Sequence, residues 1–121
     1  MRLFKVKWFA RFAKKERIRD ASLKDAIKRA AQGLVDADLG GYVIKQRVAR
    51  PGKGKSGGYR VIVAFRTEQR AVFLYGFAKS EKDNIGDDEL ATLKEIAAAW
   101  LEADERKIKT ALADGLLTEI V

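Results

Sequence analysis

Residues 42–77 read YVIKQRVARPGKGKSGGYRVIVAFRTEQRAVFLYGF and contain three apolar runs. The runs cover residues 42–48, 59–65 and 71–77 and are rich in Val, Ile, Phe and Tyr. Such runs, bounded by glycine or by polar residues, are typical of strands. A glycine-rich loop joins the first two runs, and the short turn RTEQR joins the last two. Because short connections join antiparallel neighbours, this stretch predicts a three-stranded antiparallel meander.

The segments on either side of the meander predict helices. Residues 4–8 alternate apolar side chains with lysine like a short strand, which could join the meander, and a short helix follows over residues 9–17. Residues 22–35 carry apolar side chains with the i, i+3, i+4, i+7 spacing of an amphipathic helix. Its predicted N-cap is Ser22. The DLGG of residues 38–41 is expected to end the helical region. Asp87 and Asp104 each begin a further helix, and residues 116–121 form a possible last strand. The sequence therefore predicts one α+β domain over residues 1–121.

The composition excludes several kinds of site. The chain has 121 residues, of which 47% are hydrophobic and 35% are charged, and it has no cysteine and no histidine. Disulfides, thiolate nucleophiles and zinc sites built on Cys or His are therefore absent. The first residues, MRLFKVKWFARF, interrupt their apolar runs with charge too often for a signal peptide. No run approaches the ~18 apolar residues of a membrane span. A cytoplasmic location is the default expectation.

The positive charge is concentrated in the first part of the chain. The net charge is +8, yet residues 1–70 contain 19 Lys and Arg against 6 Asp and Glu. Residues 71–121 contain 6 Lys and Arg against 11 Asp and Glu. This asymmetry indicates a surface that faces a polyanion, for which nucleic acid is the commonest identity. The alternative is a solvated face that only keeps the protein soluble.

The loop over residues 50–60, RPGKGKSGGYR, is of the kind that approaches phosphates. An ATP-binding P-loop needs the pattern G-x-x-x-x-G-K-[ST]. Gly54, Lys55 and Ser56 supply its end, but Ala49 stands where its first glycine belongs. A P-loop also runs from a strand into a helix, whereas this loop joins two predicted strands. The sequence therefore disfavours ATP.

A nucleic-acid backbone fits this loop better. Glycine lets a backbone approach a ligand closely, and Lys and Arg side chains neutralise phosphates. Lys45 and Arg47 alternate with Ile44 and Gln46, so they share one face of a strand. Four more cations surround the loop: Arg50, Lys53, Lys55 and Arg60. The planar fork of Arg60 is suited to hold a phosphate with two hydrogen bonds. The alternative is a hairpin tip whose lysines serve only solubility.

A second polar cluster, KSEKDN, follows the third predicted strand. In an antiparallel meander the end of this strand lies near the start of the strand before it. Lys79, Glu81 and Lys82 are therefore candidates to converge with the loop cations. The alternative is a strand-to-helix connection whose charges are solvated.

Three longer segments together resemble the RelE-like toxins of bacterial toxin–antitoxin modules. They are FARFAKKERI, DLGGYVIKQRVARPGKGKSGGYRVIVAF and YGFAKSEKDNIGDDEL, at residues 9–18, 38–65 and 75–90. The pattern G-x-G-K-S-G-G-x-R followed by F-A-K-x-E-x-x-N-I is similar to the HigB-like branch, and the resemblance extends to the terminal D-G-x-L-x-E-I. It implies the RelE/ParE fold, a small antiparallel sheet of three to five strands with two N-terminal helices and a C-terminal helical segment.

The resemblance also implies an activity. RelE-like toxins cut messenger RNA, typically on the translating ribosome and without a metal or other cofactor, and a cognate antitoxin neutralises them. The 2′-hydroxyl attacks the adjacent phosphate, which requires a proton acceptor, positive charge and a proton donor. Carried over by motif, Arg60 and Lys55 supply charge to the phosphate, and Lys53 supplies charge or a proton. Lys79 and Glu81 occupy the later motif, with Glu81 a candidate general base. Further RNA contacts are expected from Lys45, Arg47, Arg50 and Lys82.

The sequence departs from the family pattern at two positions. Ser80 and Gly86 stand where RelE has an arginine and a tyrosine, and neither Tyr59 nor Tyr75 matches the missing tyrosine. Two other functions therefore stay open. One is a ParE-like poison of DNA gyrase, which has the same fold and a protein target. The other is a non-catalytic member that binds nucleic acid or its antitoxin to regulate transcription.

Overall fold

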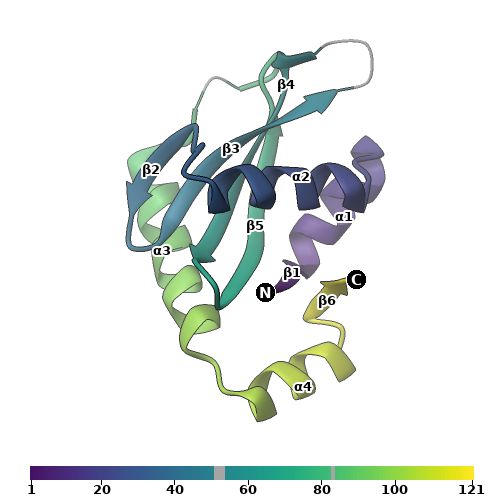
Figure 1. Ribbon diagram of the computed structural model, residues 1–121, viewed down its shortest axis with the longest axis vertical. Helices are drawn as coiled ribbons and strands as arrows, with labels where there is room; N and C mark the ends of the chain where they lie inside the picture. The colour runs from purple at the N-terminus through teal and green to yellow at the C-terminus, as the bar shows by residue number, and fades with distance from the viewer. Residues whose placement is uncertain (51–53, 83) are drawn as a thin grey trace.

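The computed structural model describes residues 1–50, 54–82 and 84–121, with residues 54–56 described by their backbone alone. The chain forms one six-stranded mixed sheet with helices on both faces (Figure 1). In chain order the elements are β1 Arg2–Val6, α1 Lys7–Glu16, α2 Asp20–Ala31, β2 Ala37–Gly40, β3 Val43–Arg50, β4 Gly54–Arg66, β5 Arg70–Ala78, α3 Asp87–Glu102, α4 Glu105–Ala113 and β6 Leu117–Ile120. The α+β class and the placement of two helices before the meander and two after it are confirmed.

The predicted meander forms the centre of the sheet. β3, β4 and β5 pair antiparallel in sequence order, with Ile44 opposite Val63 and Ala64 opposite Val72. The turn between β4 and β5 is short, and Glu68 within it has a φ of 64°. Four successive residues of β4, residues 61–64, are fully buried. A strand that is apolar on both faces belongs in the interior of a sheet that is covered on both sides.

The predicted size and direction of the sheet were wrong in two respects. The sheet has six strands in the order β2-β3-β4-β5-β1-β6, and β1 lies parallel to β5, with Leu3 opposite Ala71. After β1 the chain leaves the sheet through α1 and α2 and re-enters it at the edge, at β2, so local pattern gives no sign of the parallel pair. β2 falls in the DLGG segment that was expected only to close a helix. It turns into β3 through three residues of positive φ: Gly40, Gly41 and Tyr42.

Several element boundaries also differ from the prediction. Trp8 lies in α1 and not in the first strand. α2 begins at Asp20, before Ser22, and its N-cap is Arg19. α3 has Gly86 as its N-cap, so Asp87 is its first helical residue. The side chain of Asp104 does cap α4, where it accepts a hydrogen bond of 2.8 Å from the backbone N–H of Lys107.

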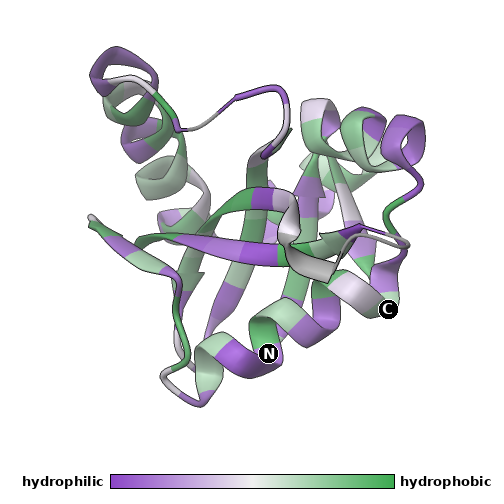
Figure 2. Ribbon diagram, turned by 90° about the horizontal axis from the view of Figure 1, so that it is seen from above, coloured by the Kyte–Doolittle hydropathy of each residue, from purple (hydrophilic) through white to green (hydrophobic). Residues whose placement is uncertain are grey.

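Two apolar clusters hold the layers together, one on each face of the sheet. Phe9, Leu23 and Phe73 belong to the cluster under α1 and α2. Ile62 and Ile108 belong to the cluster that α3 and α4 cover. The helices are banded with hydrophilic and hydrophobic residues in Figure 2, as expected of elements with one buried side. Among the helices of the described residues, none combines the length and apolar character that crossing a membrane requires.

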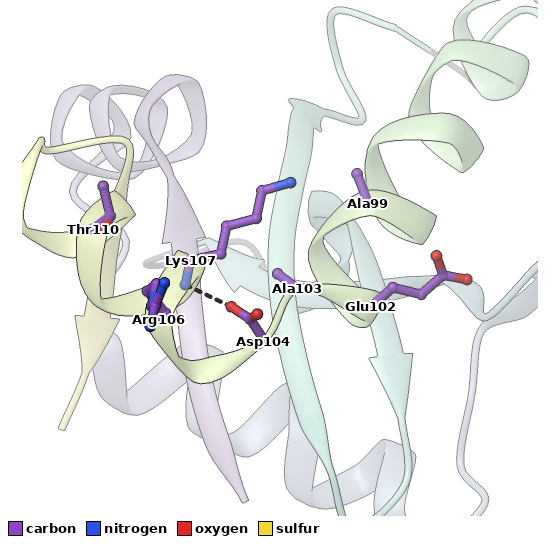
Figure 3. A pocket seen from close by; sticks show the side chains of 7 residues that line it. All are labelled: Ala99, Glu102, Ala103, Asp104, Arg106, Lys107 and Thr110. Carbon is purple, nitrogen blue, oxygen red and sulfur yellow. Dashed lines mark hydrogen bonds between the residues drawn. The ribbon is translucent and has the colours of Figure 1, made fainter.

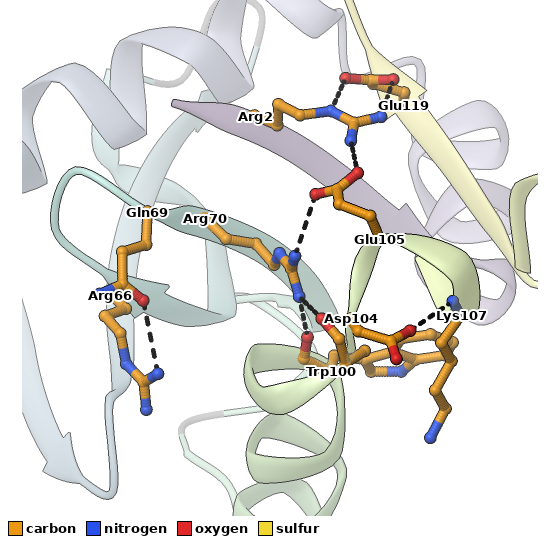
Figure 4. A network of polar contacts seen from close by, with 10 residues as sticks. Arg2, Arg66, Gln69, Arg70, Trp100, Asp104, Glu105, Lys107 and Glu119 are labelled. Atoms are coloured by element: carbon orange, nitrogen blue, oxygen red, sulfur yellow. Dashed lines mark hydrogen bonds and ion pairs between the residues drawn. The ribbon is translucent and has the colours of Figure 1, made fainter. Parts of the chain in front are cut away.

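An ion-pair network fixes the C-terminal helices to the sheet (Figure 4). Arg70, at the start of β5, donates from Nη1 to the backbone oxygens of Trp100 at 2.7 Å and Ala103 at 2.8 Å. A cation suits the carbonyl end of a helix, because the helix dipole is negative there. Arg2 pairs with Glu119 and Glu105, each at 2.9 Å. Arg70 therefore sets where α3 ends and the chain turns into α4.

Replacing Arg70 is expected to loosen this corner. Arg70→Met keeps most of the apolar stem but removes two charge-assisted hydrogen bonds, so we expect the free energy of unfolding to fall by about 2 kcal/mol. Urea denaturation measures the change, with Lys109→Met on the exposed side of α4 as the control. A loss no larger than that of the control would contradict the capping role.

Candidate nucleic-acid interface

Arg60 lies in β4 near the middle of the sheet and is only 7% exposed. It is opposite Arg47 on β3 and opposite Phe77 on β5. Two arginines at opposed positions of adjacent strands concentrate positive charge on this part of the sheet. Arginine side chains bind carboxylates and phosphates, so this pair of arginines is a candidate binding site for an anion.

Three of the predicted cations lie on the same side of the sheet. Side chains alternate between faces along a strand, so Arg60 shares its face with Ile62, which packs in the cluster under α3 and α4. On β3, Lys45 and Arg47 share the face of Val43, which belongs to the same cluster. We call Lys45, Arg47 and Arg60 the arginine face.

A buried glutamine positions the edge of the arginine face. Gln46 is fully buried, and its Nε2 donates to the backbone oxygen of Ala26 at 2.8 Å. Its Oε1 accepts from the backbone N–H of Asp36, also at 2.8 Å. This contact fixes the segment that carries the Asp36 carboxylate, which pairs with Nε of Arg47 at 2.8 Å. Arg47 is thereby held in place while about half of its side chain, 49%, stays exposed.

Arg50 lies on the opposite side of the sheet from the arginine face. Its guanidinium stands 5.6 Å from the ring centre of Tyr59, which packs in the cluster under α1 and α2. The Tyr59 hydroxyl in turn donates to Oε1 of Glu16, the last residue of α1, at 3.1 Å. Burial, followed by the hydrogen bond to Glu16, raises the pKa of Tyr59 above its ordinary value of 10.0. The predicted cluster of loop cations is thus divided between two faces.

The raised pKa of Tyr59 predicts a specific loss of stability in alkali. The unfolded chain ionises this hydroxyl first, so the stabilisation is complete below pH ~10 and is lost as pH rises through the folded-state value. We expect Tyr59→Phe to lower the free energy of unfolding by about 1 kcal/mol at pH 8 and to flatten its decline above pH ~10. Urea denaturation across this range tests it. Tyr42→Phe, at an exposed tyrosine, should change neither quantity, and an equal decline in both variants would contradict the assignment.

The KSEKDN segment begins beside the glycine loop. The backbone N–H of Lys79 donates to the backbone oxygen of Gly58 at 3.0 Å, which continues the pairing of β4 with β5. Glu81 follows in an exposed turn. Lys82 points to α3, where its Nζ lies 2.7 Å from Oε1 of Glu89, and this carboxylate raises the pKa of Lys82. The structure therefore brings Lys79 next to the base of the loop and holds Lys82 against α3.

The side chains of two predicted catalytic lysines lie outside the part of the chain that the structure describes. Lys53 lies outside the described residues, and only the backbone of Lys55, within β4, is described. Of the two positions that depart from the family pattern, Ser80 lies in the exposed turn after β5, and Gly86 is the N-cap of α3.

A hollow at the turn between α3 and α4 is separate from the arginine face (Figure 3). It lies where α3 turns into α4 and is lined by Ala99, Glu102, Ala103, Asp104, Arg106, Lys107 and Thr110. Asp104 there is already engaged as the N-cap of α4. Both acidic and basic side chains line the hollow. It is formed by the turn of the chain from α3 into α4. Within the described ranges, no three acidic side chains come close enough to form a metal site.

The comparison with family models decides the class of the protein. The model described as "RelE toxin of RelE / RelB toxin-antitoxin system" matches residues 1–120. The chain belongs to the RelE toxin family. A search of curated proteins gave no match to this RelE-family chain. A toxin role with an antitoxin as partner follows from the family, and the α+β fold agrees with it.

One cluster of aromatic side chains in this RelE-family toxin was not predicted from the sequence. Tyr75 lies 4.7 Å from Trp8 and 6.2 Å from Phe77, measured between ring centres. Phe77 is opposite Arg60, so the aromatic row ends at the arginine face. The alternation in residues 4–8 placed Trp8 in a strand, and the contact between α1 and β5 is not visible in local pattern.

Proposed function

We propose that this RelE-family toxin is an endoribonuclease that cuts messenger RNA on translating ribosomes without a metal ion. The observation that carries the proposal is the pair Arg47 and Arg60, directly opposite in adjacent strands of a RelE-family fold. Arg60 is nearly buried in a central strand, and about half of the side chain of Arg47, opposite it, is exposed. The planar fork of an arginine matches a phosphodiester, to which it can donate two hydrogen bonds.

The proposed reaction is an internal transfer at one phosphate. The 2′-hydroxyl of the nucleotide loses its proton and attacks the adjacent phosphorus, and the bond to the 5′-oxygen breaks as that oxygen takes up a proton. The products are a 2′,3′-cyclic phosphate and a 5′-hydroxyl. Negative charge grows on the non-bridging oxygens in the transition state, so fixed cations beside the phosphate accelerate the step.

The residue roles follow the family motif. Arg60 and Lys55 are proposed to neutralise the phosphate, and Lys53 to supply charge or a proton. Glu81 is the proposed general base, with Lys79 beside it. Support for this grouping comes from the hydrogen bond between Lys79 and Gly58, which places the start of the KSEKDN segment at the base of the loop. RNA contacts beyond the cleaved phosphate are proposed for Lys45, Arg47, Arg50 and Lys82.

The finer identity is also proposed on motif grounds. The residues of the glycine loop and the F-A-K-x-E-x-x-N-I segment favour the HigB-like branch of the family. A toxin that acts on ribosomes works in the cytoplasm, which we propose as its location. Its cognate antitoxin is proposed to hold it inactive until the antitoxin is removed.

Cleavage of a programmed ribosome tests the proposed function. Purified toxin is added to ribosomes carrying a defined message and, in parallel, to the same message without ribosomes. We expect cuts at the decoding site of the ribosome-bound message and a 2′,3′-cyclic phosphate on the upstream fragment, the product of attack by the 2′-hydroxyl.

Two results would contradict the proposal. Intact message in every lane, from a preparation that still arrests growth, would exclude message cleavage and favour a protein target such as gyrase. Intact message from a preparation that does not arrest growth, although it is folded, would favour the non-catalytic regulator.

A further inference from the structure

The outer side of α1 and α2 carries a second group of cations, separate from the arginine face. Within residues 9–31, all of which the structure describes, seven cationic side chains are exposed and have no ion-pair partner: Arg11, Lys14, Lys15, Arg17, Arg19, Lys24 and Lys28. We call these seven residues the helical cationic face.

The acidic residues of the same segment are not paired with this face, because each has a partner that does not belong to it. Asp20 pairs with Lys5 of β1 at 3.0 Å. Asp25 pairs with Arg29 at 3.0 Å, and Glu16 accepts the hydroxyl of Tyr59. The positive charge of the helical cationic face is therefore left uncompensated within its own segment.

The spacing of the cations places them together and away from the core. Arg11, Lys14 and Lys15 stand at i, i+3 and i+4 on α1, opposite the buried Phe9 and Ala13. Lys24 and Lys28 are four residues apart on α2. Arg29, on the β3 side of α2, donates to the backbone oxygen of Arg47.

The two helices also lie beside each other over the sheet. α2 contacts β3 and α1 contacts β5, so α1 lies on the side of α2 away from β3. Lys24 and Lys28 are exposed on α2. The cations of both helices therefore lie over the same face of the sheet.

The make-up of this surface favours nucleic acid over protein. Protein interfaces have an apolar core from which charged residues are depleted. The large exposed apolar side chains of the described residues lie elsewhere, and only Trp8, at the first turn of α1, falls between residues 7 and 31. Cations without an apolar core match a phosphate backbone, which binds through charge and releases counterions.

We infer that the helical cationic face is a second RNA-binding surface, which grips the backbone of structured, double-stranded RNA. It lies on the opposite side of the sheet from the arginine face, because α1 and α2 cover one face and Arg60 belongs to the other. The two surfaces therefore bind different RNA segments at the same time. The inference rests on the proposed function for the identity of the polyanion.

A binding assay with a non-cleavable duplex tests this surface separately from catalysis. The probe is a fluorescently labelled RNA duplex carrying 2′-O-methyl groups throughout, which lacks the attacking hydroxyl. The variant is Arg11→Gln/Lys14→Gln/Lys15→Gln on α1. The matched control is Arg106→Gln/Lys107→Gln/Lys109→Gln on α4, which removes the same charge from exposed positions of another helix. Binding is measured by fluorescence anisotropy over a range of KCl concentrations.

The salt dependence of binding distinguishes the outcomes. Each lost phosphate contact lowers the slope of log K against log salt by about 0.9, so we expect the α1 variant to lower it by about 2 to 3 and the α4 control by less than 1. Equal changes in the two variants would show a net-charge effect and overturn the inference. An unchanged slope, with weakened binding of the antitoxin by the α1 variant, would show a protein interface and also overturn it. If the unmodified toxin fails to cut message but the α1 variant alone loses duplex binding, the proposed function fails and the surface stands.

Discussion

Arg60→Ala is expected to lower the rate of message cleavage by about 10²- to 10³-fold, the usual effect of removing one fixed donor to a developing oxyanion. Its side chain is the most buried of the arginine face, at 7% exposed, and is fixed in a central strand. The effect should appear in the single-turnover rate on programmed ribosomes. Growth arrest on expression in cells should weaken in parallel.

A control on the same strand separates chemistry from folding. Arg66 ends β4 at the far end of the sheet, where its guanidinium lies 4.5 Å from the ring centre of Tyr42. Arg66→Ala removes the same charge from the same strand and should leave the cleavage rate within a few fold. Arg60→Lys keeps the charge but loses the fork, so an intermediate rate is expected. Similar losses in Arg60→Ala and Arg66→Ala, or full activity in Arg60→Ala, would remove Arg60 from the reaction.

Gly76→Ala is expected to lower the free energy of unfolding by about 3 kcal/mol, at the upper end of the usual cost of overpacking. A Cβ at residue 76 would stand 2.5 Å from Cε2 of Phe12 and 3.0 Å from its Cδ2. The Phe12 ring has little room to move, because it stacks on Trp8 at 5.4 Å and meets the edge of Tyr59 at 5.9 Å. The added methyl group must therefore displace α1 from β5.

A double-mutant cycle isolates this contact. In a Phe12→Ala background the space beside residue 76 is open, so Gly76→Ala should cost less than about 1 kcal/mol there, and the difference is the coupling energy. Gly86→Ala is the matched control, because its new Cβ would meet the nearest atom at an ordinary 3.6 Å. Urea denaturation gives all the values. Equal costs in the two backgrounds would show that the ring of Phe12 is not the obstacle.

The local part of the fold could be predicted from the sequence. The meander follows from three apolar runs with short connections. Asp104 was correctly predicted as a helix cap, because a cap depends only on residues within one turn of the chain. The pairing of β1 with β5 joins residues almost 70 positions apart, with Leu3 opposite Ala71, and depends on how α1 packs. No pattern in either strand specifies the other as its partner.

The candidate site could be predicted in residue type and only partly in position. Alternation along the strand puts Lys45 and Arg47 on one face and Arg50 on the other. The sequence prediction grouped Arg50 with the loop cations because these residues are close together in the sequence. The ion pairs of Arg47 with Asp36 and of Lys82 with Glu89 join different elements. They depend on the tertiary arrangement and leave no local trace.

The position of β1 between β5 and β6 has a consequence for the order of folding. β1 is synthesised before the other strands, but its partners are residues 70–73 of β5 and 117–120 of β6. The meander of β3, β4 and β5 needs only residues 43–78. Loop-closure entropy grows slowly with loop length, so closing the longer loop adds only about 0.5 kcal/mol at equilibrium. Folding rates, by contrast, fall as contacts become more distant in sequence. We expect pulse-labelled hydrogen exchange to protect the amides of β4 before those of β1 and β6. Equal rates of protection would mean that the sheet assembles in one step.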